Sequence, residues 1–198
     1  MRKKFILFLL IFLSIQGIFA VEITMNSEYN RGETLIAKIS GNFLTSLGRE
    51  NIFFYKGHTK IPLEFDITKI DYDYYLYAVL SNKAEGNYSL SIENIKYKVG
   101  PDIEEENIVK NFSISNKTAE FFLDKGFIVS SGEFSLILEN LNDTSLIINI
   151  STEELDPEIY VYSEEETFYS LSLRSGESKK IFFFPEEGEN KIQNNLII

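Results

Sequence analysis

Residues 134–152, FSLILENLNDTSLIINIST, alternate apolar and polar side chains on either side of a short polar segment. Leu136 and Leu138 are two residues apart before that segment, and Leu146 and Ile148 are two residues apart after it. Successive side chains of a β-strand point to opposite faces, so this repeat gives each flank one apolar face. The stretch therefore predicts two strands and a turn.

The same rhythm continues along the chain, where short alternating or aromatic-rich runs are separated by Gly, Asn, Asp and Lys. In the first half we expect strands near residues 22–25, 35–40, 52–55, 60–65, 72–80, 87–92 and 95–99. In the second half we expect strands near residues 108–114, 120–123, 127–130, 133–139, 145–150, 159–162, 169–173, 178–184 and 190–198. Many short strands joined by turn residues are typical of β-sandwiches, so the predicted fold class is all-β.

One segment interrupts this rhythm: VGPDIEEEN, residues 99–107, combines a Gly-Pro pair with a run of acidic side chains. Gly and Pro are the strongest local interruptions of regular structure. We therefore predict a linker at residues 101–107 between two sandwiches, one at residues 21–100 and the other at residues 108–198.

Residues 1–20, MRKKFILFLLIFLSIQGIFA, have the form of a secretory signal peptide, because three basic residues precede an apolar run that ends near the small Ala20. An uncleaved N-terminal anchor is the alternative, since Ile18 stands where cleavage sites usually have a smaller residue. We expect a secreted or cell-surface protein that contacts the membrane only through this segment, where the segment is retained. The chain has no Cys, so its fold depends on an apolar core and not on disulfides.

The formal charge of the whole chain is −11, and loss of the three basic residues in residues 1–20 takes it to −14. Nucleic-acid binding depends on basic side chains that neutralise phosphates, so no nucleic-acid partner is expected. Acidity of this degree suits solubility and repulsion between neighbouring molecules, and it also attracts divalent cations or basic partners.

The segment KAEGNYSLSI, residues 83–92, resembles the corner that precedes strand F in immunoglobulin-like domains. The resemblance rests on Ala84, Gly86 and Tyr88, and it implies that the tyrosine hydroxyl bonds to the upstream backbone. Antibody-type domains have a Cys two residues after this tyrosine. Leu90 stands there in this chain, so the disulfide subtype is excluded.

The segment LSLRSGESKKIFFF, residues 171–184, resembles the strand, Gly-Glu-Ser, strand ending of immunoglobulin-like modules in archaeal and bacterial cell-surface proteins. Such modules serve as stalks, spacers, adhesins and layer components. The resemblance thus implies two tandem immunoglobulin-like sandwiches with a structural, spacer or envelope-assembly role, and other envelope proteins as partners. An adhesion or binding module that recognises a protein partner or a glycan is the alternative.

Five Asn-X-Ser/Thr triplets are candidate glycosylation sites on an exported chain. They begin at Asn87, Asn111, Asn116, Asn142 and Asn149. The strand alternation predicts that Asn87, Asn111 and Asn149 face outward, while Asn116 and Asn142 fall in predicted turns. Each position is therefore predicted to accept a glycan without disturbing a core. Chance occurrence in a chain rich in Asn, Ser and Thr is the alternative.

No grouping in the sequence suggests catalysis. His58, the only histidine, lies between basic residues and has no partner at a metal-ligand spacing. There is no Gly-X-Ser-X-Gly nucleophile motif, and the many carboxylates single out no acid–base pair. We therefore predict no enzyme activity and no cofactor.

Acidic clusters leave calcium as the one metal to consider, because Ca²⁺ prefers oxygen ligands. Asp66, Asp71 and Asp73 lie close in sequence, and Asp102 and Glu104–Glu106 cluster in the predicted linker. No EF-hand loop is present. Solvated carboxylates are the preferred interpretation, and a calcium site is the alternative.

The segment DYDYYLYAV, residues 71–79, alternates two sets of side chains. Tyr74 and Leu76 belong to the more apolar set, which we place inward, so Tyr75 and Tyr77 are predicted to face outward. Exposed tyrosines provide rigid contact area for a protein partner or a sugar. The alternative is that a neighbouring loop or the second sandwich covers them.

Overall fold

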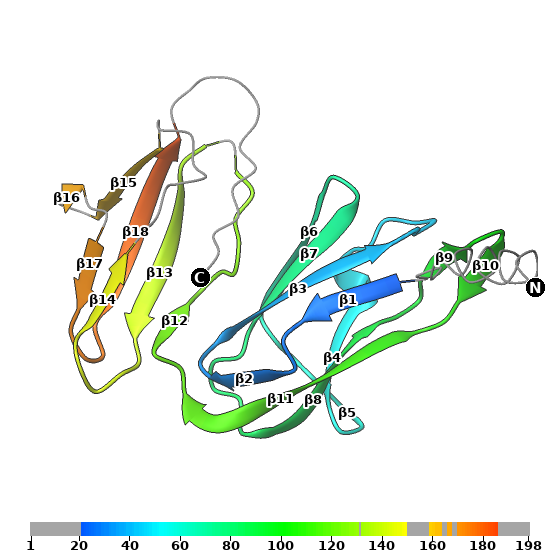
Figure 1. Cartoon of the computed structure of the whole chain (residues 1–198), viewed down its shortest axis with the longest axis horizontal. Helices are drawn as coiled ribbons and strands as arrows, with labels where there is room; N and C mark the ends of the chain where they lie inside the picture. The colour runs from blue at the N-terminus through cyan, green and yellow to red at the C-terminus, as the bar shows by residue number, and fades with distance from the viewer. Residues whose placement is uncertain (1–20, 131, 150–158, 164–165, 168–169, 186–198) are drawn as a thin grey trace, which may run out of the picture.

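The computed structural model describes residues 21–130, 132–149, 159–163, 166–167 and 170–185. Strands make up nearly all of the regular structure in these residues, and one short 3₁₀ turn, η1 (Arg49–Asn51), joins them. The strands form two groups, one from β1 to β11 and the other from β12 to β18 (Figure 1). The prediction of an all-β fold is confirmed.

Two larger sheets and a two-stranded hairpin make up the first group. The four-stranded sheet has the order β1 (Val21–Met25), β3 (Thr34–Gly41), β7 (Asp73–Val79) and β6 (Phe65–Ile70), all antiparallel. The five-stranded sheet has the order β2 (Glu28–Arg31), β11 (Ile108–Thr118), β8 (Gly86–Ile92), β4 (Ile52–Lys56) and β5 (Thr59–Ile61). Its pairs are antiparallel except for β2, which runs parallel to β11.

A single apolar cluster lies between these two sheets. Strand β8 shows how alternation contributes to this cluster. Its residues Tyr88, Leu90 and Ile92 point inward and are buried, whereas Asn87 lies on the other face and is exposed. The fully buried side chains of the cluster include Leu35, Ile39, Leu76, Leu80, Leu90, Ile92, Ile95 and Tyr97. Strand β7 departs from this alternation, since it is buried on both faces from Leu76 to Val79.

The segment expected to be a linker forms part of a hairpin. Strand β9 (Lys96–Val99) pairs antiparallel with β10 (Asp102–Glu105) around Gly100, whose φ is 60°. Acidic side chains are accommodated because they face solvent, and Lys96 pairs with Glu105 at 3.0 Å. Strand β11 then pairs with β8, so residues 108–114, expected to open the second sandwich, complete the five-stranded sheet of the first group.

The second group also contains two sheets. The larger has the order β12 (Phe121–Leu123), β13 (Phe134–Asn140), β18 (Ser178–Pro185), β15 (Ile159–Ser163) and β16 (Glu166–Thr167). The smaller pairs β14 (Leu146–Asn149) with β17 (Ser170–Leu173). Their buried cluster consists of Leu123, Leu136, Leu138, Leu171, Leu173, Ile181 and Phe183. The strands predicted on either side of residues 141–145 are present, and they lie in different sheets.

Three further differences separate the expected strands from the observed ones. Residues 60–65 form the end of β5 and the start of β6, because Pro62 lies between them and has no N–H for a sheet. Strand β2 was not expected and pairs through its backbone with β11. No strand forms at residues 127–130, and residues 190–198 lie outside the described part of the chain.

The tyrosine corner has the geometry that its sequence implies. The Tyr88 hydroxyl donates a hydrogen bond to the Ala84 carbonyl at 2.5 Å, and the Tyr88 ring stacks on Phe112 at 5.6 Å. Gly86 has a φ of 140°, which an L side chain rarely adopts. The corner thus gives a buried phenol a hydrogen-bond partner at the start of β8.

A pair of tyrosines in the same core provides a test of this corner. We expect Tyr88→Phe to lower the free energy of unfolding by about 1 kcal/mol, because the Ala84 carbonyl loses its donor. We expect Tyr29→Phe to cost less, because the buried Tyr29 hydroxyl interacts with the Asn26 backbone without forming a hydrogen bond of ordinary geometry. Urea unfolding followed by circular dichroism measures both. Equal losses in the two variants would show that the Tyr88 bond contributes nothing.

Candidate functional site

Two Asn-X-Ser triplets lie side by side on the outer face of the five-stranded sheet. In the register of β8 and β11, Asn87 is opposite Ser113 and Asn111 is opposite Ser89. Each asparagine therefore faces the hydroxyl residue of the other triplet. The pairing is reciprocal because the two strands are antiparallel and each triplet places its first and third residues on the same face.

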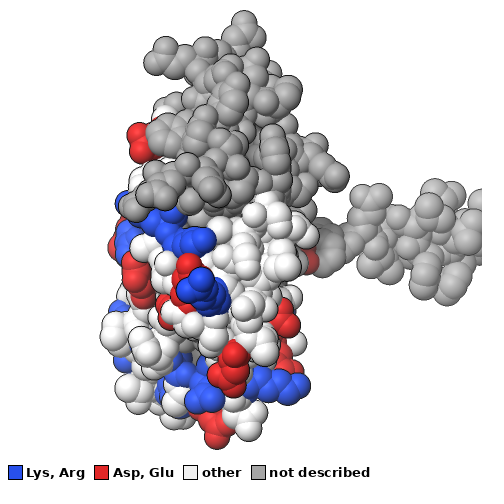
Figure 2. Space-filling model, turned by 90° about the vertical axis from the view of Figure 1, so that its left-hand side faces the viewer, with Lys and Arg blue, Asp and Glu red and all other residues white. Residues whose placement is uncertain are grey.

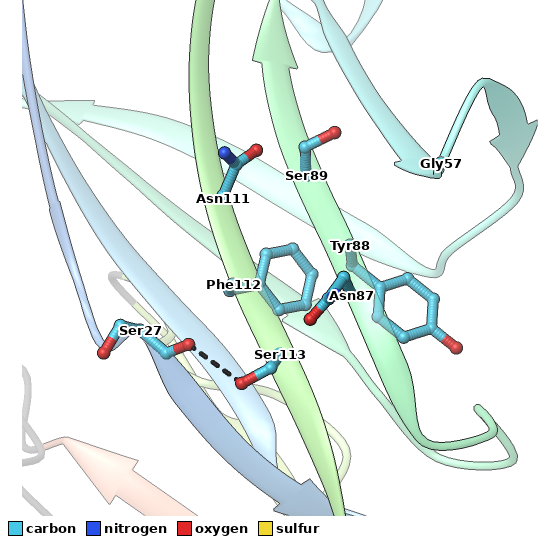
Figure 3. A pocket seen from close by; sticks show the side chains of 8 residues that line it. All are labelled: Ser27, Gly57, Asn87, Tyr88, Ser89, Asn111, Phe112 and Ser113. Atoms are coloured by element: carbon cyan, nitrogen blue, oxygen red, sulfur yellow. Dashed lines mark hydrogen bonds between the residues drawn. The ribbon is translucent and has the colours of Figure 1, made fainter.

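These four side chains surround an open hollow of about 480 Å³ (Figure 3). Ser27 and Gly57 complete its rim, and the Ser113 hydroxyl donates a hydrogen bond to the Ser27 carbonyl at 3.3 Å. Amides and hydroxyls, which are neutral donors and acceptors at physiological pH, share the lining with Tyr88 and Phe112. Such a surface suits a neutral, hydroxyl-rich molecule such as a sugar, and it offers no nucleophile paired with a base.

Sequence reasoning could not identify Ser27 or Gly57 as part of this site. Ser27 precedes the unexpected strand β2, and its carbonyl also accepts the Ser113 backbone N–H at 2.9 Å. Gly57 lies in the turn between β4 and β5 with a φ of 59°. Only the assembled sheet brings these segments beside β8 and β11.

All five candidate glycosylation asparagines are exposed. Asn87, Asn111 and Asn149 face outward from their strands, as the alternation predicts. Asn142 follows β13 in a bend, whereas Asn116 lies within the long strand β11 and not in a turn. The chain therefore presents five amides on which a glycan would meet solvent.

The predicted partner surface on β7 has a different environment. Tyr77 is 9% exposed, and its ring packs edge-on against Phe127 at 5.2 Å. This burial raises the pKa of the Tyr77 hydroxyl. Tyr75 is half-buried, and Tyr72, in the turn before β7, is 90% exposed. The outward face of β7 is thus covered at Tyr77 by the segment that follows β12.

The three aspartates considered for calcium do not form a cluster. Asp73 pairs with Lys38 at 2.8 Å, and this hydrogen bond lowers the pKa of the Asp73 carboxyl. Asp66 pairs with Arg49 at 3.1 Å, and Asp71 lies in a turn with a φ of 56°. Within the described ranges, no group of three or more His, Cys, Asp or Glu side chains is placed to hold a metal ion.

His58 is exposed in the turn between β4 and β5. No hydrogen bond or ion pair of the described residues involves its imidazole. The acids of the expected linker are exposed on and after β10, and Glu106 accepts a hydrogen bond from the Tyr97 hydroxyl at 2.6 Å. These side chains have positions consistent with solvation and with stabilisation of a hairpin.

Charges of both signs are interspersed on the face drawn in Figure 2, where Lys and Arg lie close to Asp and Glu. That arrangement differs from the continuous basic surface that nucleic-acid binding uses. Among the residues that the structure places, no helix is both long and apolar enough to cross a membrane. Neither the protein-family models nor the curated proteins compared with this chain give a match.

Proposed function

We propose that the protein is an exported, non-catalytic surface or secreted protein built from two tandem immunoglobulin-like sandwiches, with a spacer or envelope-assembly role. The strand order of the first group supports this proposal. Its sheets correspond to the A-B-E-D sheet and to a C, F and G sheet of immunoglobulin-like domains, with β2 added beside β11. The corner at Tyr88 lies at the start of β8, the strand that corresponds to F.

The observation that carries the spacer role is the packed connection between the two strand groups. Strand β11 leads directly to Ala119, whose backbone N–H donates to the Arg31 carbonyl at 2.9 Å. The Thr34 hydroxyl donates to the Leu123 carbonyl at 2.7 Å. A spacer must hold its two ends at a defined separation, and contacts at the connection restrict its bending. We therefore place the boundary between the two sandwiches near residues 119–120.

A second contact tightens the same connection. Leu141, which follows β13, lies so close to Gly32 that a Cβ built on the glycine would be 2.5 Å from the leucine Cδ1. The Leu141 backbone N–H donates to the Glu120 carbonyl at 2.9 Å. The turn before β3 and the end of β13 can thus contact each other because Gly32 has no side chain. Contacts of this kind oppose relative motion of the two strand groups, which is otherwise the default for domains joined in tandem.

The alternative function, adhesion or binding to a protein partner or a glycan, is supported by fewer surface features than the sequence predicted. Burial of Tyr77 removes the centre of the predicted tyrosine patch. The hollow beside Asn87 and Asn111 is the remaining candidate for recognition of a glycan or a protein partner. Other envelope proteins remain the proposed partners of the spacer, and its acidity keeps neighbouring copies apart.

Export is tested by the N-terminus of the protein taken from its own cells. We expect the mature chain to be found in the secreted or envelope fraction and to begin at Val21 or within a few residues of it. Fractionation followed by N-terminal peptide mapping measures both properties. Recovery of intact Met1 in the soluble cytoplasmic fraction would overturn the proposed localisation.

A further inference from the structure

We propose that the face around Asn87 and Asn111 is a glycan-bearing face, at which a saccharide is attached to one or both amides. This inference rests on the proposed export of the chain. The same face is the outer surface of β8 and β11, whose inner surface carries Tyr88 and Phe112 in the core. A saccharide attached here would occupy the hollow on the outer side of the sheet, where Tyr88 and Phe112 also contribute to the lining.

The strand geometry places the parts of each triplet together. In an extended strand, residues two apart share a face, so the Asn87 amide and the Ser89 hydroxyl point to the same side. The same holds for Asn111 and Ser113 on the neighbouring strand. N-glycosylation requires a hydroxyl residue two positions after the asparagine. Both triplets satisfy this rule, and the structure directs both toward one open hollow.

The side-chain amides of Asn87 and Asn111 are also not used in hydrogen bonds that hold the fold together. Neither the Asn87 nor the Asn111 side chain forms a hydrogen bond with any described residue. Asn30, Asn51 and Asn140, which begin no such triplet, all use their side-chain amides in hydrogen bonds within the fold. Substitution of the amide N–H at Asn87 or Asn111 therefore breaks no contact.

The reaction needs a saccharide donor, which we identify as a polyprenyl-phosphate-linked or diphosphate-linked sugar. The Asn Nδ2 forms a bond to the anomeric carbon, and the bond from that carbon to the phosphate oxygen breaks. The phosphate leaves with the electron pair, and the proton lost by the amide nitrogen is taken up by the leaving phosphate or by solvent water. The amide remains uncharged, so the neutral character of the hollow is preserved.

The consequence concerns the contacts that this sheet can make. A saccharide on β8 and β11 would cover the hollow on this face of the five-stranded sheet. A flat strand face without such cover can associate with other proteins, and bulky solubilising groups oppose this. In the proposed spacer, the glycan-bearing face of β8 and β11 would therefore remain in contact with solvent, and partner proteins would bind other surfaces.

The test is glycopeptide mass spectrometry of the full chain purified from its own envelope or secreted fraction. Trypsin releases Asn87 in the peptide 84–96 and Asn111 in the peptide 111–117. We expect at least one of these peptides to carry a saccharide mass, located at Asn87 or Asn111 by electron-transfer fragmentation. The second peptide also contains Asn116, so fragmentation is needed to assign its site.

Matched variants separate attachment from folding. We expect Ser89→Ala to abolish the saccharide at Asn87 and Ser89→Thr to retain it, because threonine also completes the triplet. Asn107→Gln, at an exposed asparagine that begins no triplet, should leave the pattern unchanged. Unmodified Asn87 and Asn111 on a chain that has lost residues 1–20 would overturn the glycan proposal and leave export standing. Retention of Met1 in the cytoplasm would overturn both.

Discussion

Replacing Asn140 with Ala is expected to lower the free energy of unfolding by about 3 kcal/mol, one of the largest losses for any polar residue of this chain. Asn140 is 0% exposed. Its Nδ2 donates to the carbonyls of Leu173 and Arg174, both at 3.1 Å. It also donates to the Thr144 carbonyl at 2.8 Å. Removal of the amide takes a donor from the buried bond to Leu173 and from the part-buried bond to Thr144, whereas the Arg174 carbonyl keeps the Glu177 backbone N–H at 3.0 Å. Each unsatisfied buried group costs about 1–3 kcal/mol.

The position of Asn140 explains why its effect extends beyond one strand. It ends β13, and its Oδ1 accepts the Asn142 backbone N–H at 2.9 Å. Its Nδ2 bonds reach the turn that joins β17 to β18. The amide therefore connects the end of β13 to two turns of the second strand group. Urea unfolding monitored by circular dichroism measures the loss.

Two variants provide the controls for Asn140. Asn142→Ala removes an exposed side chain and should change stability by less than about 0.5 kcal/mol. Asn140→Asp keeps the shape but replaces the donor by an acceptor that faces carbonyl oxygens, so it should cost at least as much as Asn140→Ala. A loss below about 1 kcal/mol for both Asn140 variants would contradict this account.

The alternation of apolar residues was sufficient to predict most strands, because burial of one face imposes a repeat of two. Strands β8 and β13 lie close to their expected bounds for this reason. The acidic segment 101–107 was interpreted as a linker from its composition. Composition cannot show that the backbone of this segment pairs with β9 or that Lys96 lies across the hairpin from Glu105.

Alternation within a strand also predicts some features of the candidate site and misses others. Exposure of Asn87 and Asn111 follows from the burial of their neighbours Tyr88 and Phe112, which the alternation indicates. The reciprocal pairing of the two triplets depends on the register between β8 and β11, which no local pattern encodes. Asn140 did leave a signal in the sequence, since it occupies the inward position two residues after the buried Leu138.

Alternation also defines two faces of β7 without showing whether the outer face is covered. Tyr74 and Leu76 are buried as expected, and Tyr72 is exposed because it precedes the strand. Tyr77 lies on the predicted outer face and is buried by residues about fifty positions later in the chain. Long-range packing of this kind, and not the strand pattern, determines the environment of the tyrosine.

The contact between Tyr77 and the segment after β12 is close enough to be tested by substitution. A Cβ built on Gly126 would be 2.7 Å from the Tyr77 Cβ and 2.9 Å from Ile36 Cγ1, both shorter than real side chains allow. We expect Tyr77→Ser to lower the free energy of unfolding by about 3 kcal/mol, because it removes a buried ring and leaves a cavity beside Phe127. We expect Gly126→Val to displace the segment outright.

Limited proteolysis measures this displacement, because a segment that leaves the surface becomes accessible to protease. In the Gly126→Val and Tyr77→Ser variants, cleavage should concentrate within residues 119–130 and separate the two strand groups. Tyr75→Ser, at a half-buried position on the same strand, is the matched control and should leave the cleavage rate close to that of the unaltered chain. Loss of cell-surface retention in Tyr77→Ser at unchanged stability would instead identify Tyr77 as a partner site. Loss of stability would identify its ring as a structural contact between the two strand groups.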